Sequence, residues 1–299
     1  MKTVLIDMNN LMMRMLFSGD VLISKPDDKY DIIDYDWNMF EFKIFSSVFY
    51  YMSQAKKCTE LVLAIDGKRK DTWRNLKWPR YKDNRKKPKK NEYNIDWKEV
   101  NAKYLNLMTE ILNNFPIKCI RCNLAEADDV IASIVMNTSQ KHHIISSDKD
   151  YIQLYEPNRV AIFSPTKKDF MKHPNTELFV VEQSLIGQAK DNIFNIKTPL
   201  DYPDEKRKPG FGPKAAEKVF VHGYKKWLKE NNLEERFEFN RTLLDFKRIP
   251  KDLQEFILKK YNSIEYPHAD KMYKYLEKKN WTEFLDDWTW RERIFMELF

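Results

Sequence analysis

Residues 142–154, HHIISSDKDYIQL, place two aspartates directly after a short apolar run. The run has the length and composition of a buried β-strand. Asp148 and Asp150 follow it with one lysine between them. Ser and Asp also gather in turns, where their side chains bond the local backbone, so a simple turn is the alternative for this stretch. Other parts of the chain decide between the turn and a functional site.

Further apolar runs alternate with helical patterns through the first two-thirds of the chain. We expect buried strands over residues 3–7 (TVLID), 60–66 (ELVLAID), 117–122 (IKCIRC) and 142–148, with two more candidates over 159–163 (RVAIF) and 177–181 (ELFVV). Residues 40–55 and 101–115 have the length and periodicity of amphipathic helices. Strands that alternate with helices predict an α/β fold with a mostly parallel central sheet, covered on both faces.

The strand pattern fades after about Leu185. Residues 212–230 and 252–264 are highly charged and follow a helical period instead. We therefore expect two domains: an α/β domain over residues 1–186 and a helical domain over residues 187–299.

The composition is that of an ordinary globular protein, with 42% hydrophobic and 14% aromatic residues among 299. No uncharged run approaches the roughly 20 residues that cross a bilayer, and Asp7 and Arg14 interrupt the apolar N-terminus. We expect neither a membrane segment nor a signal peptide, and a cytoplasmic location. Cys119 and Cys122 form a C-x-x-C pair, but strand positions three apart face opposite ways, which favours reduced thiols over a zinc or redox site.

The positive charge is concentrated in one internal segment. Residues 68–90 hold twelve Lys or Arg against two Asp, a local charge of +10, so the rest of the chain sums to −3 of the net +7. Trp73, Trp78 and Tyr81 are interspersed with these cations. A solvated loop is the alternative, but cations among aromatic rings suit a nucleic-acid strand, because phosphates need charge and bases need stacking surfaces. We therefore expect nucleic-acid binding here.

Three of the expected strands end in aspartate: Asp7, Asp66, and the pair Asp148 and Asp150. In an open parallel sheet the ligand crevice lies beyond the carboxyl ends of the strands, so these side chains are expected to share one crevice.

Residues 124–135, LAEADDVIASIV, add acids at the start of an expected helix. Glu126, Asp128 and Asp129 fall in its first turn. Favourable interaction with the helix dipole is the alternative explanation. So many carboxylates in one crevice would repel one another without a cation, and oxygen-only ligands select Mg²⁺ or Mn²⁺. Such clusters can hold two ions that cleave phosphodiester bonds.

Motifs in chain order resemble those of the flap endonuclease (5′-nuclease) family, most closely its stand-alone phage replication members. They are LIDMNN (5–10), AIDGKRKDTWR (64–74) with YKDNRK (81–86), AEADD (125–129), SSDKD (146–150), GQAKDNI (187–193) and GFGPKAA (210–216). The resemblance implies a PIN-like nuclease core, a basic helical arch over about 68–105 and a helix-hairpin-helix over about 209–222.

The family's activity implies a metal-dependent 5′ to 3′ exonuclease and flap endonuclease, which cuts RNA–DNA and DNA–DNA duplexes and removes RNA primers and flaps during replication. It further implies two Mg²⁺ ions, with Mn²⁺ as a substitute, and a K⁺ ion at the helix-hairpin-helix. The implied partners are branched or nicked DNA, RNA–DNA hybrids, and a replication clamp or single-strand-binding protein. The resemblance also implies a monomer in the cytoplasm of a phage-infected host.

By motif position, the resemblance assigns Asp7, Asp66, Glu126 and Asp128 to a first metal site. Asp148, Asp150 and Asp191 belong to a second, with Asp129 nearby. Lys82 and Arg85 match the cationic pair that faces the scissile phosphate, and together with Asp7, Asp66 and Asp148 they form the expected catalytic set. The expected nucleic-acid contacts are Arg69, Arg74, Tyr81, Lys82, Arg85, Gly210, Gly212 and Lys214.

The segment GFGPKAA also has a reading of its own. Gly212 allows a tight turn, Pro213 suits the first position of a helix, and free backbone N–H groups there can hold a phosphate. An ordinary Gly-Pro helix start is the alternative.

Two features depart from the family pattern. Gln188 stands where the family usually has an aspartate, so the second metal site lacks one charge. A polar insert over residues 197–208 has no role that can be read from the sequence. A PIN-type ribonuclease and a branched-DNA-binding protein without strong catalysis are the alternative functions.

Overall fold

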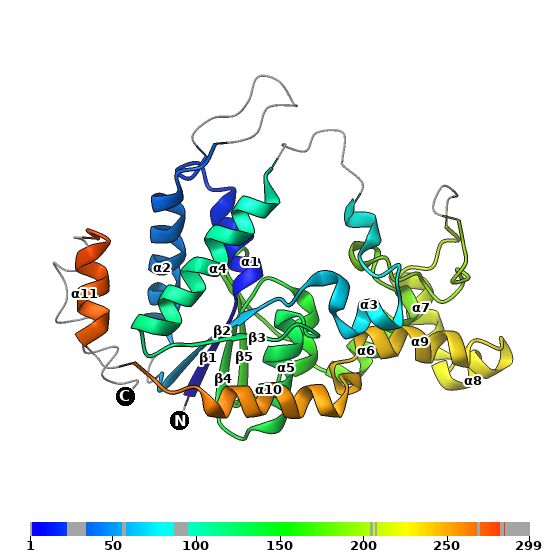
Figure 1. Ribbon diagram of the computed structural model, residues 1–299. Helices are drawn as coiled ribbons and strands as arrows, with labels where there is room; N and C mark the ends of the chain where they lie inside the picture. Colours follow the sequence, from blue (N-terminus) through cyan, green and yellow to red (C-terminus); the bar gives the residue numbers. More distant parts are fainter. Residues whose placement is uncertain are drawn as a thin grey trace.

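A six-stranded sheet in the order β3-β2-β1-β4-β5-β6 forms the centre of the computed structural model (Figure 1). The structure describes residues 2–22, 34–55, 58–86, 95–203, 206, 208–267, 270–281 and 284. The strands are β1 (Lys2–Asp7), β2 (Glu60–Ile65), β3 (Lys118–Arg121), β4 (Lys141–Ile145), β5 (Val160–Ser164) and β6 (Asp169–Met171). The first five pair in parallel and β6 pairs antiparallel to β5, which confirms the predicted α/β class with a mostly parallel sheet.

The topology creates a crevice at the carboxyl ends of β1 and β4. β1 pairs with β2 on one side and with β4 on the other, so the winding direction reverses between β1 and β4. Connections leave these two strands in opposite directions, and ligands of open α/β sheets bind at such a switch point. The residues that follow β1, β2 and β4 are therefore brought to one edge.

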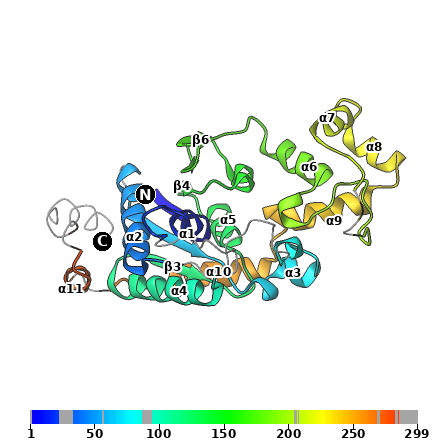
Figure 2. The same ribbon diagram turned by 90° about the horizontal axis from the view of Figure 1, so that it is seen from above.

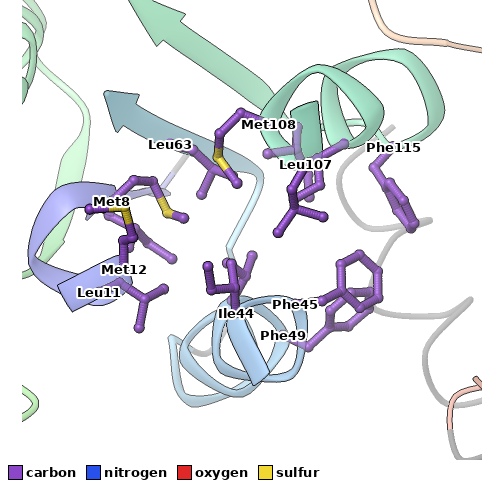
Figure 3. Close-up of a cluster of buried hydrophobic side chains, with 14 of the residues drawn as sticks. Met8, Leu11, Met12, Ile44, Phe45, Phe49, Leu63, Leu107, Met108 and Phe115 are labelled. Carbon is purple, nitrogen blue, oxygen red and sulfur yellow. The ribbon is translucent and has the colours of Figure 1, made fainter. Parts of the chain in front are cut away.

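Two apolar layers bury the sheet because its strands alternate their side chains. Val4 and Ile6 point into a cluster formed with α1 (Met8–Leu16), α2 (Trp37–Gln54), α4 (Trp97–Asn114) and α11 (Asp270–Lys278). Leu5, between them, points into a second cluster with α5 (Ala127–Asn137) and α10 (Lys251–Ser263). Figure 3 shows the first layer, where Met8, Leu11 and Met12 from α1 meet Ile44 and Phe45 from α2 and Leu107 from α4.

The C-terminal half contributes to both layers and to a third cluster. α6 (Thr176–Ile186), α7 (Pro213–Val221), α8 (Tyr224–Glu230) and α9 (Glu234–Leu244) share that cluster, with α7 and α8 at the far end of the molecule from α2 (Figure 2). By contrast, Ile257 of α10 and Leu276 of α11 are buried in the two layers that cover the sheet. The expected domain boundary between residues 186 and 187 stays a prediction. After this boundary, α10 and α11 pack against the layers of the sheet.

One expected strand is wrong. Residues 177–181 lie inside helix α6, whose N-cap Asn175 accepts a hydrogen bond from the Leu178 N–H at 2.9 Å. Val180 and Ser184, and likewise Val181 and Leu185, are buried four residues apart on one helix face. The β-branched composition of ELFVV suggested a strand, whereas the cap and the period over the following residues select the helix.

The basic segment begins with η1 (Arg69–Asp71), α3 (Trp73–Lys77) and η2 (Asp83–Lys86), and leads into α4. Residues 87–94 of the expected arch lie outside the described residues. Within the described part of the chain, no helix combines the length and the apolar character that a membrane crossing needs.

Candidate active site

A cleft of about 800 Å³ opens at the switch point of the sheet. Asp7 ends β1, Asp66 follows β2 and Asp148 follows β4, as the sequence predicted. All three line the cleft, together with Glu126 and Asp128 from the start of α5. We call Asp7, Asp66, Glu126 and Asp128 the first carboxylate group, and Asp148, Asp150 and Asp191 the second.

Asp7 and Asp66 are held by hydrogen bonds from several elements. Asp7 Oδ2 accepts from Ser146 Oγ at 3.0 Å and from the Tyr151 hydroxyl at 3.2 Å. Asp66 accepts from Asn9 Nδ2 and from the Ala127 N–H, both at 2.7 Å. The second of these bonds seats Asp66 on the N-terminus of α5, where unpaired backbone N–H groups favour an anion.

The loop after β2 fits its neighbours closely. Gly67 donates its N–H to the Ala125 carbonyl at 2.8 Å. A Cβ atom on Gly67 would lie 2.3 Å from the Cys122 carbonyl oxygen, so only glycine fits there. This close approach brings Asp66 to the first turn of α5.

The first group carries unfavourable mutual charge. Burial and the neighbouring Glu126 and Asp7 raise the pKa of Asp66 to about 7. Burial and the charge of Asp148 raise the pKa of Asp7, although its hydrogen bonds oppose the shift. The two carboxyls therefore resist simultaneous ionisation unless a cation lies beside them.

Glu126 receives the cation that reaches in from the basic segment. Lys82 Nζ lies 2.5 Å from Glu126 Oε1, and the Tyr81 hydroxyl donates to Oε2 at 2.7 Å. Burial opposes ionisation of Glu126, but Lys82 and Arg74 outweigh it and lower its pKa to about 2. Lys82 adopts a left-handed backbone conformation with φ 54°, which is unfavourable for a residue with a Cβ. Its N–H donates to the Asp191 carbonyl at 2.9 Å, which helps to hold this conformation.

Three expected site residues have other roles in the structure. Arg74 is only 2% exposed, with Nη1 2.8 Å from Asp129 Oδ1 and 3.4 Å from Glu126 Oε2. Asp129 is 0% exposed and also accepts from Trp73 Nε1 at 3.1 Å. Tyr81 is 3% exposed. Burial leaves Arg74 and Tyr81 little surface for a strand, and all three side chains position the first group through these bonds, so their expected contacts with a strand or a metal ion stay predictions.

The second group is neutralised by cations of the chain itself. Lys190 Nζ lies 2.7 Å from Asp148 Oδ1 and 3.1 Å from Asp150 Oδ2. Arg85 Nη2 lies 2.5 Å from Asp191 Oδ1. Burial opposes ionisation of Asp148, but Lys190 outweighs it and lowers the pKa of Asp148. Burial and Asp148 raise the pKa of Asp150 to about 6, although Lys190 counteracts them.

The chemistry of the two groups differs in its fit to a divalent ion. Among the described residues, no three Asp, Glu, His or Cys side chains stand at the spacing that holds a metal ion. The first group fits the requirement in kind, because its carboxylate oxygens line one cleft and repel one another. In the second group a full positive charge, Lys190, bonds both Asp148 and Asp150, whereas the hydrogen bonds to Asp7 and Asp66 come from neutral donors.

The expected hairpin contacts lie at the start of α7. Gly210 and Lys214 are exposed, and Gly212 is the N-cap residue before Pro213. The tight turn expected at Gly212 is wrong, because its φ of −122° and ψ of −170° are extended values that any residue adopts. A Cβ on Gly210 or Gly212 would meet nothing within 4 Å, so the backbone there is open to a ligand.

Arg80 and Lys190 were missed by sequence reasoning. Arg80 donates to the carbonyls of Leu200 at 2.9 Å and Tyr202 at 3.0 Å, which ties the polar insert to the entrance of the basic segment. Because Leu200 is 120 residues away, no local sequence pattern indicates this contact. Lys190 did have a signal, because it stands between Gln188 and Asp191 in the GQAKD motif.

Comparison with known proteins identifies the same regions. Residues 2–183 match the family described as 5′-3′ exonuclease, N-terminal resolvase-like domain, and residues 174–288 match that described as T4 RNase H, C terminal. The chain is 29% identical over 247 residues to ribonuclease H of Enterobacteria phage T4, which covers 79% of this chain and 81% of that protein. It is also 29% identical over 169 residues to DNA polymerase I of Rhizobium leguminosarum, covering 53% of this chain and 14% of the polymerase.

Solved structures agree on the fold. A flap endonuclease of bacteriophage T5, solved as a pseudo-enzyme-product complex with DNA and metal ions, superposes with a TM-score of 0.61 at 16% identity, covering 88% of this chain and 99% of that one. A second structure of the T5 protein, co-crystallised with metal ions, gives 0.62 at 18% identity with the same coverage. The first family match spans more than half of the chain and confirms the 5′-nuclease resemblance predicted from the motifs. The protein is a member of the 5′-3′ exonuclease family.

Proposed function

We propose that this chain is a divalent-metal-dependent 5′-nuclease that removes 5′ flaps and RNA primers from branched or nicked DNA and RNA–DNA hybrids. The observation that carries the proposal is the convergence of the first carboxylate group and Lys82 on one cleft. Family membership supplies the reaction class, and the relatives include a phage ribonuclease H and a flap endonuclease crystallised with DNA and metal ions.

In this proposal the first carboxylate group holds Mg²⁺, or Mn²⁺ in its place. When bound, such an ion generates a hydroxide nucleophile and neutralises charge on the phosphate. Asp66 and Asp7 are kept in place by Ala127, Asn9, Ser146 and Tyr151, so little reorganisation is required of them.

Lys82 and Arg85 are proposed to bind the scissile phosphate. In this structure each is paired to a carboxylate, Lys82 to Glu126 and Arg85 to Asp191. Were Glu126 to hold the ion, the Lys82 ammonium would no longer be needed there and could bind the phosphate. Arg85 is 47% exposed and already lines the cleft, so it needs only to release Asp191. Arg69 lines the same cleft and is proposed as a further phosphate contact.

An apolar rim on the cleft supports a nucleic-acid substrate. Met13, Phe17 and Trp97 are 38%, 41% and 44% exposed, and all three line the cleft beside the carboxylates. Large exposed apolar side chains next to charged ones offer stacking surface for unpaired bases. Gly210, Gly212 and Lys214, with a K⁺ ion as a further expectation, are proposed to hold the duplex backbone at a distance from the cleft.

The proposal includes a protein partner, a replication clamp or a single-strand-binding protein. Residues 288–299 (WTWRERIFMELF) carry aromatic and aliphatic side chains that could dock such a partner or pack as a terminal helix, and they lie outside the described residues.

The test is cleavage of three substrates, a 5′-flap DNA, an RNA–DNA hybrid and a single-stranded RNA, with Mg²⁺ and with EDTA. We expect Mg²⁺-dependent cleavage of the first two, with Asp66→Asn inactive but still binding the flap DNA. Asp252→Asn, an exposed carboxylate on α10, is the matched control and should cleave normally. Binding without cleavage by the wild type would favour the branched-DNA-binding alternative, and preferential cleavage of the RNA would favour a PIN-type ribonuclease.

A further inference from the structure

Lys190 occupies the centre of the second carboxylate group. Its ammonium contacts Asp148 Oδ1 at 2.7 Å, Asp148 Oδ2 at 2.9 Å and Asp150 Oδ2 at 3.1 Å. The three N–H donors of an ammonium are matched by three carboxylate oxygens. The remaining oxygen, Asp150 Oδ1, accepts from Gln188 Nε2 at 2.6 Å. Every oxygen of this carboxylate pair therefore already has a donor from the chain.

The loop that carries Lys190 is closed by its own backbone. Gln188 and Ile193 exchange hydrogen bonds at 2.9 and 3.0 Å. Gly187 has φ +73°, and a Cβ there would lie 2.5 Å from the Ile193 carbonyl oxygen. The 3₁₀ turn η4 (Ala189–Asp191) lies inside this loop. Gln188 and Lys190 are thus presented together towards the two aspartates by a rigid turn.

We propose that Lys190 is a tethered cation that occupies the second carboxylate group in place of a metal ion, so that a divalent ion binds there only by displacing it. The proposal rests on the proposed function, because it concerns the metal requirement of the same cleft. It assigns different affinities to the two carboxylate groups: the first group holds its ion tightly, and the second holds one weakly.

Displacement is physically open to Lys190. Its side chain is 45% exposed, so the ammonium can leave Asp148 for solvent or for a substrate phosphate without crossing protein. Gln188 remains behind as a donor to Asp150. Because an amide N–H donates whereas a carboxylate can only accept, the Nε2 atom must face Asp150. Gln188 therefore orients Asp150, and its replacement by aspartate would add repulsion at this point.

The test measures metal binding to the full chain without nucleic acid. Mn²⁺ is titrated into the wild type and into Lys190→Met, with free Mn²⁺ followed by electron paramagnetic resonance. We expect one tight and one weak ion in the wild type, and a second ion bound about tenfold or more tightly in Lys190→Met, since a competing charge at contact distance is gone. Lys149→Met is the matched control, because Lys149 lies between the same two aspartates but is exposed.

The outcomes separate this inference from the proposed function. If Lys190→Met leaves the second dissociation constant unchanged, or if Lys149→Met tightens it equally, Lys190 is not the competitor and the inference fails while the first ion remains. If neither protein binds any Mn²⁺, both the inference and the metal-dependent function fail. Lys190→Arg retains the charge and should retain weak second-site binding, which distinguishes lost competition from a disturbed fold. Asp66→Asn should weaken the first ion alone.

Discussion

Glu126 of the first carboxylate group and the pair Asp148 and Asp150 of the second lie at the same edge of the sheet, but different parts of the chain supply their cations. Glu126 of the first group is paired with Lys82, which belongs to the basic segment that a substrate strand is proposed to contact. Asp148 of the second group is paired with Lys190, in a loop closed by its own backbone bonds. Substrate binding can therefore change the charge balance at Glu126 through Lys82 and at Asp191 through Arg85, whereas Asp148 and Asp150 keep Lys190 until a phosphate or an ion displaces it.

The lining of the cleft follows the same division. All four residues of the first group line it, whereas Asp148 is the one member of the second group that does so among the described residues. The first group thus faces the substrate space, and we expect it to dominate the chemistry.

The largest expected effect is on cleavage. Asp66→Asn should lower the single-turnover rate on a 5′-flap substrate by at least about 10³, comparable to or beyond the loss of one preorganised transition-state contact. Asp148→Asn should lower it by only about 10-fold, because Lys190 stays close to Asp150. Equal losses in the two variants would contradict the division between the groups.

The next effect is on the free energy of unfolding, and it concerns Arg74, which pairs with Glu126 and Asp129. Arg74→Met leaves Asp129, which is fully buried, without its ionic partner. Removing one member of a buried pair costs about 3–5 kcal/mol, and we expect that loss in the free energy of unfolding from urea titration. Arg248→Met breaks a pair with Glu238 in which both side chains are about half exposed, and should cost less than about 1 kcal/mol. A small loss for Arg74→Met would mean that Asp129 is neutralised in another way.

A third prediction uses the opposite pKa shifts of Asp66 and Asp148. The folded-state pKa of Asp66 is raised to about 7, so the metal-free protein loses stability as pH rises from the unfolded value towards 7. Asp66→Asn should therefore raise the melting temperature at pH 8 in EDTA. The pKa of Asp148 is lowered, so its contribution is present above the unfolded value, and Asp148→Asn should lower the melting temperature at pH 8.

Both changes in melting temperature should be a few degrees, since 1 kcal/mol moves the melting temperature of a chain this large by about 2–4 °C or less. At pH 4, near the unfolded pKa of aspartate, both differences should shrink. Excess Mg²⁺ at pH 8 should abolish or reverse the advantage of Asp66→Asn. If the melting temperature changed in the same direction in both variants at pH 8, Asp66 and Asp148 would be neutralised in the same way and the prediction would be wrong.

The sequence predicted the sheet and the position of the acids well, because both follow from local patterns. A short apolar run that ends in aspartate, repeated at β1, β2 and β4, specifies strands and their carboxyl-end residues together. The error at residues 177–181 arose where a β-branched run coincided with a helix cap at Asn175. A single run of five residues could not decide between them.

The electrostatic partners were not predictable in the same way. Arg74 lies in a basic segment and carries no mark that distinguishes a buried arginine from a strand contact. Its partners Glu126 and Asp129 are 52 and 55 residues away, so only the tertiary fold pairs them. Asp129 likewise shares its helical turn with Asp128, and burial alone separates their roles, since Asp128 stays 23% exposed.

The smallest expected effect concerns the apolar rim, which belongs to the first group's side of the cleft. Met13 is on α1, which follows Asp7, and Trp97 is on α4, which bonds towards Asp66 through Tyr104 and Asn9. An unpaired base that stacks on Trp97 would lie over the first group, and stacking contributes about 1–3 kcal/mol per base. Trp97→Ala should therefore raise the Kd of a 5′-flap substrate about fivefold or more.

The comparison substrate is a nicked duplex without a flap, for which Trp97→Ala should change the Kd by less than about twofold, since no unpaired base is offered to the rim. Phe256→Ala is the matched control, because Phe256 is 54% exposed on α10, away from the cleft lining. Kd values are measured with Ca²⁺ in place of Mg²⁺ so that the strand stays intact. If flap and nicked substrates weaken equally, Trp97 contacts duplex rather than an unpaired base. The unpaired strand of the substrate would then have to lie along the second carboxylate group. In that case the scissile phosphate would be assigned to the second group and not to the first.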